Sequence, residues 1–192
     1  LAEDIPLDCI TLAGSGEPTL NSDIGRVISQ IKKISALPVV VLTNGSLLPD
    51  PDVRASLMTA DIVIPSLDAH SAKLFETINR PHHFIGFDQM VGGIADFSKE
   101  FRGQLWLEMF IMEGINAALS DAEAFRPLVE KINPDKIYVN TAVRPPAETF
   151  VRPASSDRIH EFYNLLDKQP QQDVKFTRYQ PADHTEGGIA RS

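Results

Sequence analysis

The sequence predicts an α/β protein whose core is a sheet of parallel strands. Five short apolar segments alternate with stretches in which apolar residues recur at helical spacing. Two of the segments contain continuous apolar runs without clean alternation, VVVL and IVIP, which is typical of parallel strands buried on both faces. Glycine and polar residues gather directly after the segments, where parallel strands end. The fold class follows from these three observations.

Each element has its own local signal. Ser22 is expected to cap the first helix, Pro51 suits the first turn of the second, and Ser156 is expected to cap the last. The pair Gly92 and Gly93 weakens the fourth helix. We expect strands at 8–13, 39–43, 62–66, 105–112 and 136–141, helices at 24–34, from 51 onward, 71–79, 84–101, 121–132 and 157–168, a short strand or extended segment at 174–179, and a polar tail at 181–192.

The composition narrows the class of protein. The 192 residues are enough for one domain with a sizeable core, and 43% hydrophobic with 23% charged residues is ordinary for a globular protein. A formal net charge of −8 argues against broad wrapping of nucleic acid, but leaves room for a local basic pocket and a tRNA partner. No apolar run has membrane-spanning length, and no secretory signal precedes the first strand. With Cys9 as the lone cysteine, expected as a small buried thiol, a cytoplasmic location is predicted.

Alternation along the strands places polar side chains on shared faces. A carboxylate in the middle of the fourth strand, Glu108, is costly to bury unless it is paired or hydrogen-bonded. If the faces that carry Ser66, Glu108 and Asn140 point into a barrel, the three side chains converge near its mouth. Trp106 and Phe110, on the same strand as Glu108, are expected in the core.

The stretch GSGEPTLN follows the first strand and has the character of a small-molecule loop. Gly14 and Gly16 allow a ligand to approach the backbone closely, Glu17 offers a negative charge to an ammonium group, and Pro18 fixes the exit. The lysine and hydroxyl residue of a P-loop are absent, as is the third glycine of the dinucleotide fingerprint. The loop therefore favours a ligand with a positive amino group over a phosphate.

This loop resembles the Gly-Gly-Glu-Pro-like element of the radical S-adenosylmethionine (radical SAM) superfamily, with Ser15 inserted between the glycines. The resemblance continues in order through VVLTNGSLL, PSLDA, INRPH, LEMFIMEGIN and NTAVRPPAE, and covers residues 8–148. Within the superfamily, the chain looks similar to iron–sulfur oxidoreductases of the molybdenum-cofactor-biosynthesis and wybutosine type.

The resemblance implies a partial, TIM-barrel-like (β/α)6 fold in which this chain lacks the first strand and the cluster loop. Residues 1–152 would form the radical SAM core, and residues 153–192 a C-terminal helix with a polar tail or linker. The implied cofactors are SAM and a [4Fe–4S] cluster, whose three-cysteine motif is absent and is expected upstream. Implied SAM contacts are Gly14, Gly16 and Glu17 at the amino group, Ser66 at the ribose with Asp68 less favoured, Glu108 at the ribose or carboxylate, and Asn140 and Val143 at the adenine.

The implied activity is that of an enzyme of the oxidoreductase or transferase type. A reduced cluster would cleave SAM to a 5′-deoxyadenosyl radical that abstracts hydrogen from an unknown small-molecule or macromolecular substrate. The implied electron donor is a flavodoxin or ferredoxin, and no residue of this chain is assigned as a catalytic acid or base or as a metal ligand. Without cluster ligands, the chain by itself is expected to be inactive. An open barrel edge makes a homo-oligomer conceivable.

Two other classes remain open at this point. A conventional barrel lyase would use Glu17 or Glu108 as a base, but no strand end carries the lysine it would need. A cluster-free scaffold would bind a nucleotide-like ligand or a partner. We expect His82 and His83 to be surface histidines rather than metal ligands. Arg144 could bind a substrate anion or pair with Glu148, and the sequence does not decide between these roles.

Overall fold

The computed structural model describes residues 7–142 and 151–166. Within these residues no helix has the length and apolar character needed to cross a membrane. The strands are β1 (Ile10–Leu12), β2 (Val39–Thr43), β3 (Ile62–Pro65), β4 (Gln104–Phe110) and β5 (Lys136–Asn140); the helices are the 3₁₀ turn η1 (Pro18–Leu20), α1 (Ile24–Ile34), α2 (Pro51–Leu57), α3 (Ala72–Ile78), α4 (Phe87–Glu100), α5 (Leu119–Ile132) and α6 (Ser156–Leu166).

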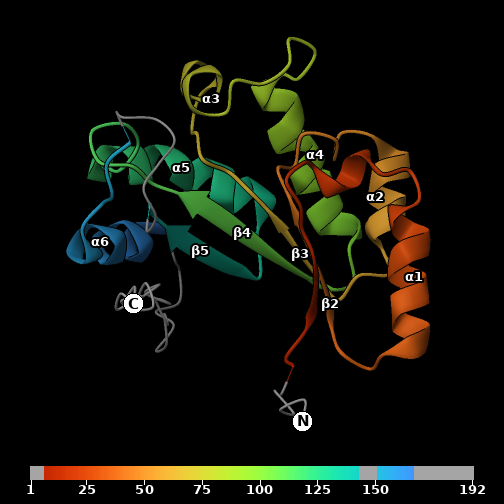
Figure 1. Cartoon of the computed structure of the whole chain (residues 1–192). Helices are drawn as coiled ribbons and strands as arrows, with labels where there is room; N and C mark the ends of the chain where they lie inside the picture. Colours follow the sequence, from red (N-terminus) through yellow and green to blue (C-terminus); the bar gives the residue numbers. More distant parts are fainter. Residues whose placement is uncertain (1–6, 143–150, 167–192) are drawn as a thin grey trace, which may run out of the picture.

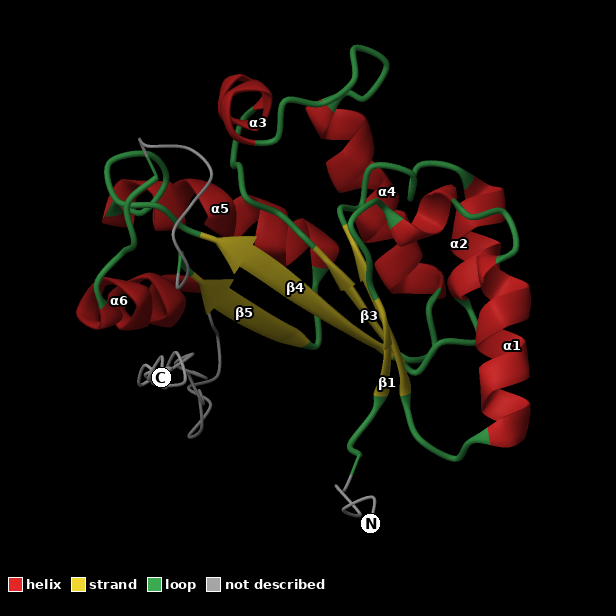
Figure 2. Ribbon diagram, viewed as in Figure 1, coloured by secondary structure: helices red, strands yellow, loops and turns green. Residues whose placement is uncertain are grey.

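The strands form one sheet in which neighbours in sequence are neighbours in space. The order is β1-β2-β3-β4-β5, and every pairing is parallel. The sheet does not close, since β1 and β5 are its two edges (Figure 1, Figure 2). The predicted α/β fold with an open, barrel-like parallel sheet is confirmed, and all five strands lie where the sequence places them, to within a few residues at each end.

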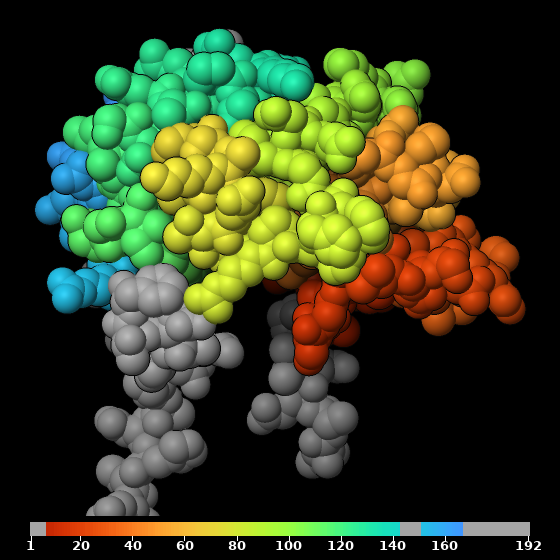
Figure 3. Space-filling model, turned by 90° about the horizontal axis from the view of Figure 1, so that it is seen from above, coloured from red at the N-terminus to blue at the C-terminus, as the bar shows by residue number. Residues whose placement is uncertain are grey.

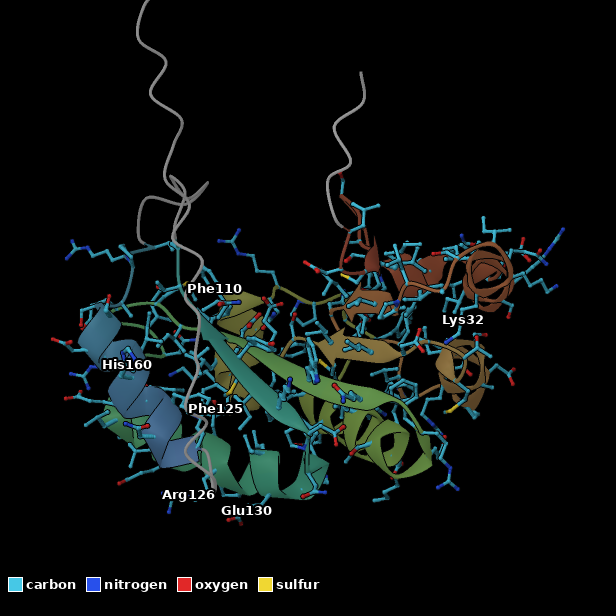
Figure 4. The ribbon with its side chains drawn as sticks, turned by 90° about the horizontal axis from the view of Figure 1, so that it is seen from below. Lys32, Phe110, Phe125, Arg126, Glu130 and His160 are labelled. Atoms are coloured by element: carbon cyan, nitrogen blue, oxygen red, sulfur yellow. The ribbon has the colours of Figure 1, made fainter. Side chains whose placement is uncertain are left out.

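The two faces of the sheet differ in what covers them. Seen from below, α4, α5 and α6 lie along one face, and α1 and α2 continue this layer toward β1 (Figure 4). Leu105, Leu107 and Met109 of β4 point to this covered face and are at most 2% exposed. The alternate residues of the same strand are partly exposed on the other face. There the described part of the chain arches around a hollow (Figure 3).

The covered face holds the hydrophobic core, and its last layer joins α5 to α6. Phe125 and Phe162, both fully buried, meet edge to face with ring centroids 5.9 Å apart. Arg126, labelled in Figure 4, donates from Nε and Nη2 to the carbonyl of Leu165 at 3.2 and 3.0 Å, which satisfies a free carbonyl at the end of α6. The segment after β5 therefore belongs to the same core as the strands.

Two helix starts carry polar side-chain caps, but the expected cap at Ser156 is wrong: Ser156 is the first residue of α6, and Ser155 before it accepts a hydrogen bond from the Arg158 amide at 3.2 Å. Ser71 accepts a hydrogen bond from the Leu74 amide, and Asp50 accepts one from the Asp52 amide at 2.8 Å, with Pro51 in the first turn. The expected cap at Ser22 is wrong, because α1 begins one residue later behind Asp23, whose side chain caps nothing. Asn21 accepts from the Asp23 amide at 3.0 Å and ends the preceding turn there.

The prediction for Cys9 is also wrong. The residue is exposed and stands just before β1, which begins at Ile10. The apolar run led to the expectation of a buried strand, but β1 is an edge strand, and only one neighbour, β2, pairs with it among the described residues. A strand flanked on one side cannot bury residues at its outer end.

The glycine pair of α4 gives a matched test of the packing. The helix is continuous through both glycines, contrary to the weakness expected from sequence. A Cβ on Gly93 would lie 2.3 Å from the backbone nitrogen of Pro49, so Gly93 lets α4 pack against the Leu48–Pro49 backbone, whereas a Cβ on Gly92 would meet nothing within 4 Å.

We therefore expect opposite effects from one substitution at adjacent positions. Gly93→Ala should lower the free energy of unfolding by at least about 1–3 kcal/mol through overpacking. Gly92→Ala should raise it by up to about 1 kcal/mol, because alanine has the better helix propensity. Urea unfolding of both variants, followed by circular dichroism, measures the difference. Equal effects of the same sign would contradict the packing of α4 described here.

Candidate functional site

The loop after β1 is held by one carboxylate. Oε1 of Glu17 accepts from the Thr19 amide at 3.0 Å, from the Thr19 hydroxyl at 2.6 Å and from the Thr43 hydroxyl at 2.6 Å. Its Oε2 accepts from the Asn44 amide at 2.7 Å. Both threonines are almost fully buried. Glu17 therefore joins the end of β1 to the end of β2, and its carboxylate is largely occupied by donors of its own chain.

Hydrogen bonds continue from this carboxylate across the carboxyl edge of the sheet. The Ser66 amide donates to the Thr43 carbonyl at 3.0 Å, and the Ser66 hydroxyl lies 3.5 Å from Oε2 of Glu108. Asn140 Nδ2 donates to Oε1 of Glu108 at 2.8 Å. The structure thus brings together the side chains of Ser66, Glu108 and Asn140, as the strand alternation predicts. We call Glu17, Thr43, Ser66, Glu108 and Asn140 the edge row.

The glycines of the loop are not required by the chain itself. Gly14 and Gly16 do not adopt positive φ. A Cβ on Gly16 would meet nothing within 4 Å, and one on Gly14 would make only ordinary contacts at 3.7 and 3.8 Å. Gly45, by contrast, has φ +74° and would place a Cβ 3.0 Å from the Ile94 side chain. Neither packing nor backbone conformation therefore requires glycine at these two exposed positions, and the open space leaves room for a ligand to approach the backbone closely.

A second network ties the end of β3 to the end of β4. Asp68 accepts from the Phe110 amide at 2.9 Å and from Asn79 Nδ2 at 3.1 Å. Asn116, fully buried, donates to the carbonyls of Asp68 and Phe110, both at 2.8 Å, and accepts from the Met112 amide. Burial raises the pKa of Asp68 above its ordinary value, while the two hydrogen bonds lower it and the nearby Glu108 charge raises it further. These contacts make Asp68 a residue of the framework behind Glu108.

The remaining predicted residues lie apart from the edge row. Val143 and Arg144 fall outside the described residues. His82 and His83 lie in the loop between α3 and α4, with ring centroids 4.2 Å apart, and line a cavity of 620 Å³ with Phe75 and Phe87. None of the described residues form a group of three or more His, Cys, Asp or Glu able to hold a metal ion.

Several residues of the site were not predicted from sequence. Thr19, Thr43 and Asn116 emerge only from their hydrogen bonds; the TNG turn after a buried strand was a signal for Thr43 alone. The expectation that Trp106 and Phe110 lie in the core is wrong. Both are partly exposed on the uncovered face of β4, because the buried side of that strand is taken by Leu105, Leu107 and Met109.

The two implied cofactors fit these residues differently. A [4Fe–4S] cluster does not fit, since Cys9 is the sole cysteine of the sequence and a cluster needs at least three thiolates. A molecule with an amino group and a ribose fits better. The open loop at Gly14 and Gly16 stands at one end of the edge row, and the carboxylate of Glu108 keeps one oxygen whose described partner is a hydroxyl at 3.5 Å.

Asp68 gives the site a measurable pH signature. A raised pKa in the folded state means that the folded chain binds more protons than the unfolded chain, so stability falls as pH rises from the ordinary value of 3.8 to the raised one. Asp68→Asn keeps the acceptor for the Phe110 amide and removes this titration. The stability of Asp68→Asn relative to the parent should therefore improve as pH rises through that window, measured by denaturant unfolding at several pH values. A constant difference would show that Asp68 is not shifted.

Comparisons with known proteins place this geometry in context. No family model matches the chain. It is 44% identical over 138 residues to GTPase Obg of Brachyspira hyodysenteriae, covering 72% of this chain and 20% of that protein. It is 29% identical over 162 residues to the UPF0026 protein MJ1312 of Methanocaldococcus jannaschii, covering 84% and 50%, and 31% identical over 94 residues to a probable GTP 3′,8-cyclase of Saccharolobus islandicus, covering 49% and 29%. The chain thus spans half or less of the length of these curated relatives.

Solved structures agree on the architecture. A domain of the pyruvate-formate lyase-activating enzyme of Bacteroides vulgatus superposes with a TM-score of 0.64 at 13% identity, over 83% of this chain and 93% of that one. A radical SAM methyltransferase of Sphaerobacter thermophilus superposes with a TM-score of 0.64 at 22% identity, over 83% and 48%. The resemblance indicated by the sequence motifs is thereby confirmed at the level of the fold: this chain has the partial-barrel fold found in radical SAM enzymes.

Proposed function

We propose that this chain is the SAM-binding core of a radical SAM enzyme. The observation that carries the proposal is the loop at Gly14 and Gly16, whose glycines the chain does not need for its own packing. Glu17 fixes this loop at the carboxyl end of β1, at the head of the edge row. Carboxyl ends of parallel strands are where α/β folds bind their ligands.

The edge row has the order and reach that an elongated ligand would need. Glu108 lies on β4, three strands away from β1. The spacing between neighbouring strands puts it about 14 Å from the loop along the edge of the sheet. The loop would take the amino group of SAM, Ser66 and Glu108 would contact the ribose, and Asn140 would border the adenine. A carboxylate that accepts from hydroxyl groups of a ribose is a common arrangement in nucleotide sites. Val143, proposed at the adenine, lies outside the described residues.

Glu17 would act mainly through the loop. Its carboxylate already accepts four hydrogen bonds, three of them on Oε1. Removing it would leave the buried hydroxyls of Thr19 and Thr43 without their acceptor, which costs about 1–3 kcal/mol for each buried donor. In this proposal Glu17 shapes the loop, and the amino group of SAM is received by loop backbone and by the remaining capacity of Oε2.

This chain lacks the three thiolates that a [4Fe–4S] cluster needs. SAM bound to a reduced cluster supplies a carbon radical in enzymes of this kind, and the residues described here would hold SAM and exclude water. This chain spans only part of the length of its relatives. We propose that the cluster ligands lie in a further part of the whole protein, and that the whole protein receives the electron and acts on the substrate.

Two other activities find less support. A lyase with Glu17 as general base would need a carboxylate free to take a proton, yet four chain donors occupy it. The relative named a GTPase shares only 20% of its length with this chain, and the sequence of this chain holds no P-loop with its lysine. GTP hydrolysis is therefore not proposed.

Substitutions of Thr43 test whether Glu17 acts by shaping the loop or by contacting the ammonium group of SAM directly. If Glu17 acts through the loop, Thr43→Val should weaken SAM binding to a similar degree as Glu17→Gln, about tenfold to a hundredfold, because both break the same link. Thr43→Ser keeps the hydroxyl and should bind SAM like the parent. If Glu17 contacts the ammonium directly, Glu17→Gln should be far more damaging than Thr43→Val. Isothermal titration calorimetry with SAM, extended to millimolar concentration, measures the three affinities.

The matched control is Glu123→Gln. Glu123 lies exposed on α5, and this substitution removes the same charge as Glu17→Gln. The Glu123→Gln variant should therefore bind SAM with the affinity of the parent. Circular dichroism must show all variants folded. Absence of saturable SAM binding to the parent chain, or equal weakening by Glu123→Gln, would contradict a SAM site at the edge row.

The cluster account makes its own prediction. Anaerobic incubation of this chain with iron and sulfide should leave negligible bound iron and no broad iron–sulfur absorption, since Cys9 alone cannot hold a cluster. No 5′-deoxyadenosine should form with SAM and dithionite. Iron analysis and chromatography of the SAM products provide the measurements. Stoichiometric iron in this chain would overturn the account.

A further inference from the structure

The loop that joins α3 to α4 presents an aromatic side chain to solvent. Phe84 is 79% exposed, and the loop that carries it projects from the body of the fold (Figure 1). Its ring therefore contributes little to the core of its own chain. One exposed apolar side chain is ordinary on a protein surface, so its meaning depends on what surrounds it.

The tip of this loop is held in a defined shape. Arg80 has a φ of +46°, in the left-handed region that commonly follows the last turn of a helix, and the Ile85 amide donates to the His82 carbonyl at 2.8 Å. The rings of His82 and His83 lie 5.2 and 4.0 Å from the ring of Phe84. We call His82, His83 and Phe84 the knob. A side chain ordered in advance loses little freedom when a partner covers it.

The cavity of 620 Å³ lies directly beside the knob. Phe75 and Phe87, whose ring centroids are 5.8 Å apart, supply apolar lining and are only 5% and 7% exposed. The exposed carboxylates of Glu76 and Asp88 also line it. Phe84 of the same chain is not among the lining residues. The volume lies within the range of about 300–1,000 Å³ that ligand pockets have, so the cavity has room for an aromatic side chain.

The knob and the cavity are complementary in chemistry. The ring of Phe84 matches the apolar lining, and the imidazoles of His82 and His83 offer N–H donors, in either protonation state, to the carboxylates of Glu76 and Asp88. Both surfaces are adjacent on one molecule. Two copies related by a twofold axis can therefore each place a knob in the other's cavity, which makes a closed contact.

We propose that this chain forms a homodimer in which Phe84 of each copy inserts into the cavity between α3 and α4 of the other. Two aromatic rings bury about 150–250 Å² each, and an equal area of cavity wall brings the total to about 600–1,000 Å². Interfaces below about 1,200 Å² are typical of transient complexes. The dimer should accordingly be weak, with a dissociation constant that is micromolar or higher. It does not depend on SAM binding at the edge row.

Analytical ultracentrifugation of the 192-residue chain, without SAM, tests the association. The weight-average mass should rise from 21.2 kDa at low micromolar concentration toward twice that value at millimolar concentration. A mass that stays at that of the monomer over the whole range would overturn the proposal, and it is the result expected if a small molecule or another protein occupies the cavity. A rise past the dimer would contradict the closed twofold contact.

Three substitutions assign the contact to the knob and the cavity. Phe84→Asp would bring a carboxylate against Glu76 and Asp88 of the second copy, and Ala72→Trp would fill the cavity from its lining. Each should weaken dimerisation at least about tenfold. The matched control is Ile34→Asp, which makes the same kind of change at an apolar residue that is 85% exposed at the end of α1, and it should dimerise like the parent. Equal weakening by Ile34→Asp, or none by Phe84→Asp, would overturn the proposal.

Mixing two variants separates insertion from other contacts of Phe84. The Phe84→Asp variant keeps its cavity, and the Ala72→Trp variant keeps its knob, so a mixed dimer has one of the two contacts. The mixture should show a higher weight-average mass than either variant alone at the same total concentration. A mixture that never exceeds the single variants would contradict insertion into the cavity. Circular dichroism must show every variant folded; if Ala72→Trp does not fold, the comparison of Phe84→Asp with Ile34→Asp decides.

The dimer and the proposed function can fail separately. A mass that doubles in a chain without saturable SAM binding would support the dimer and contradict the SAM proposal. SAM binding by a chain that stays monomeric at millimolar concentration would do the reverse.

Discussion

Each strand of this sheet pairs in parallel with the next strand along the chain, so every crossover has to return over the same face. The helices consequently gather on one side and bury it. The same constraint brings all five carboxyl ends to one edge and leaves the opposite face without a described helix (Figure 1, Figure 4). Both the edge row and the uncovered face are consequences of strand direction and order, before any particular side chain is considered.

Within that frame, the edge is held together by polar contacts rather than by packing. Glu17 joins β1 to β2, Ser66 joins β2 to β3, and Glu108 joins β3 to β4 and β5. A hydrogen bond to a charged group contributes roughly 1.5–3 kcal/mol, more than a neutral one. Loss of Glu17 would also leave the hydroxyls of the two buried threonines beside it without a hydrogen-bond acceptor, which would lower the stability of the fold further. Rigid strand ends hold a site more exactly in place than free loops do.

The second network serves the same purpose on the other side of Glu108. Asn116 satisfies both of its amide hydrogens and its oxygen inside the protein, and it fixes the chain where it leaves β3 and β4. Asp68 is thereby kept as an acceptor of framework hydrogen bonds, although its position on the strand made it a candidate ligand residue. No polar side-chain atom of the described residues is buried without a partner. A satisfied network of this kind orders the strand ends around Glu108.

The sequence by itself determined the elements and part of the site. Periodicity along the chain reports each residue's own helix or strand, and parallel register carries equivalent positions to one edge, which is why the meeting of Ser66, Glu108 and Asn140 was predictable. It could not reveal that Thr43, 26 residues away, would bind Glu17. Nor could the sequence separate Gly93 from Gly92, or show that Cys9 is exposed and Trp106 partly exposed. Those facts depend on which elements pack together and which face they cover, and contacts between distant segments exist only in the tertiary structure.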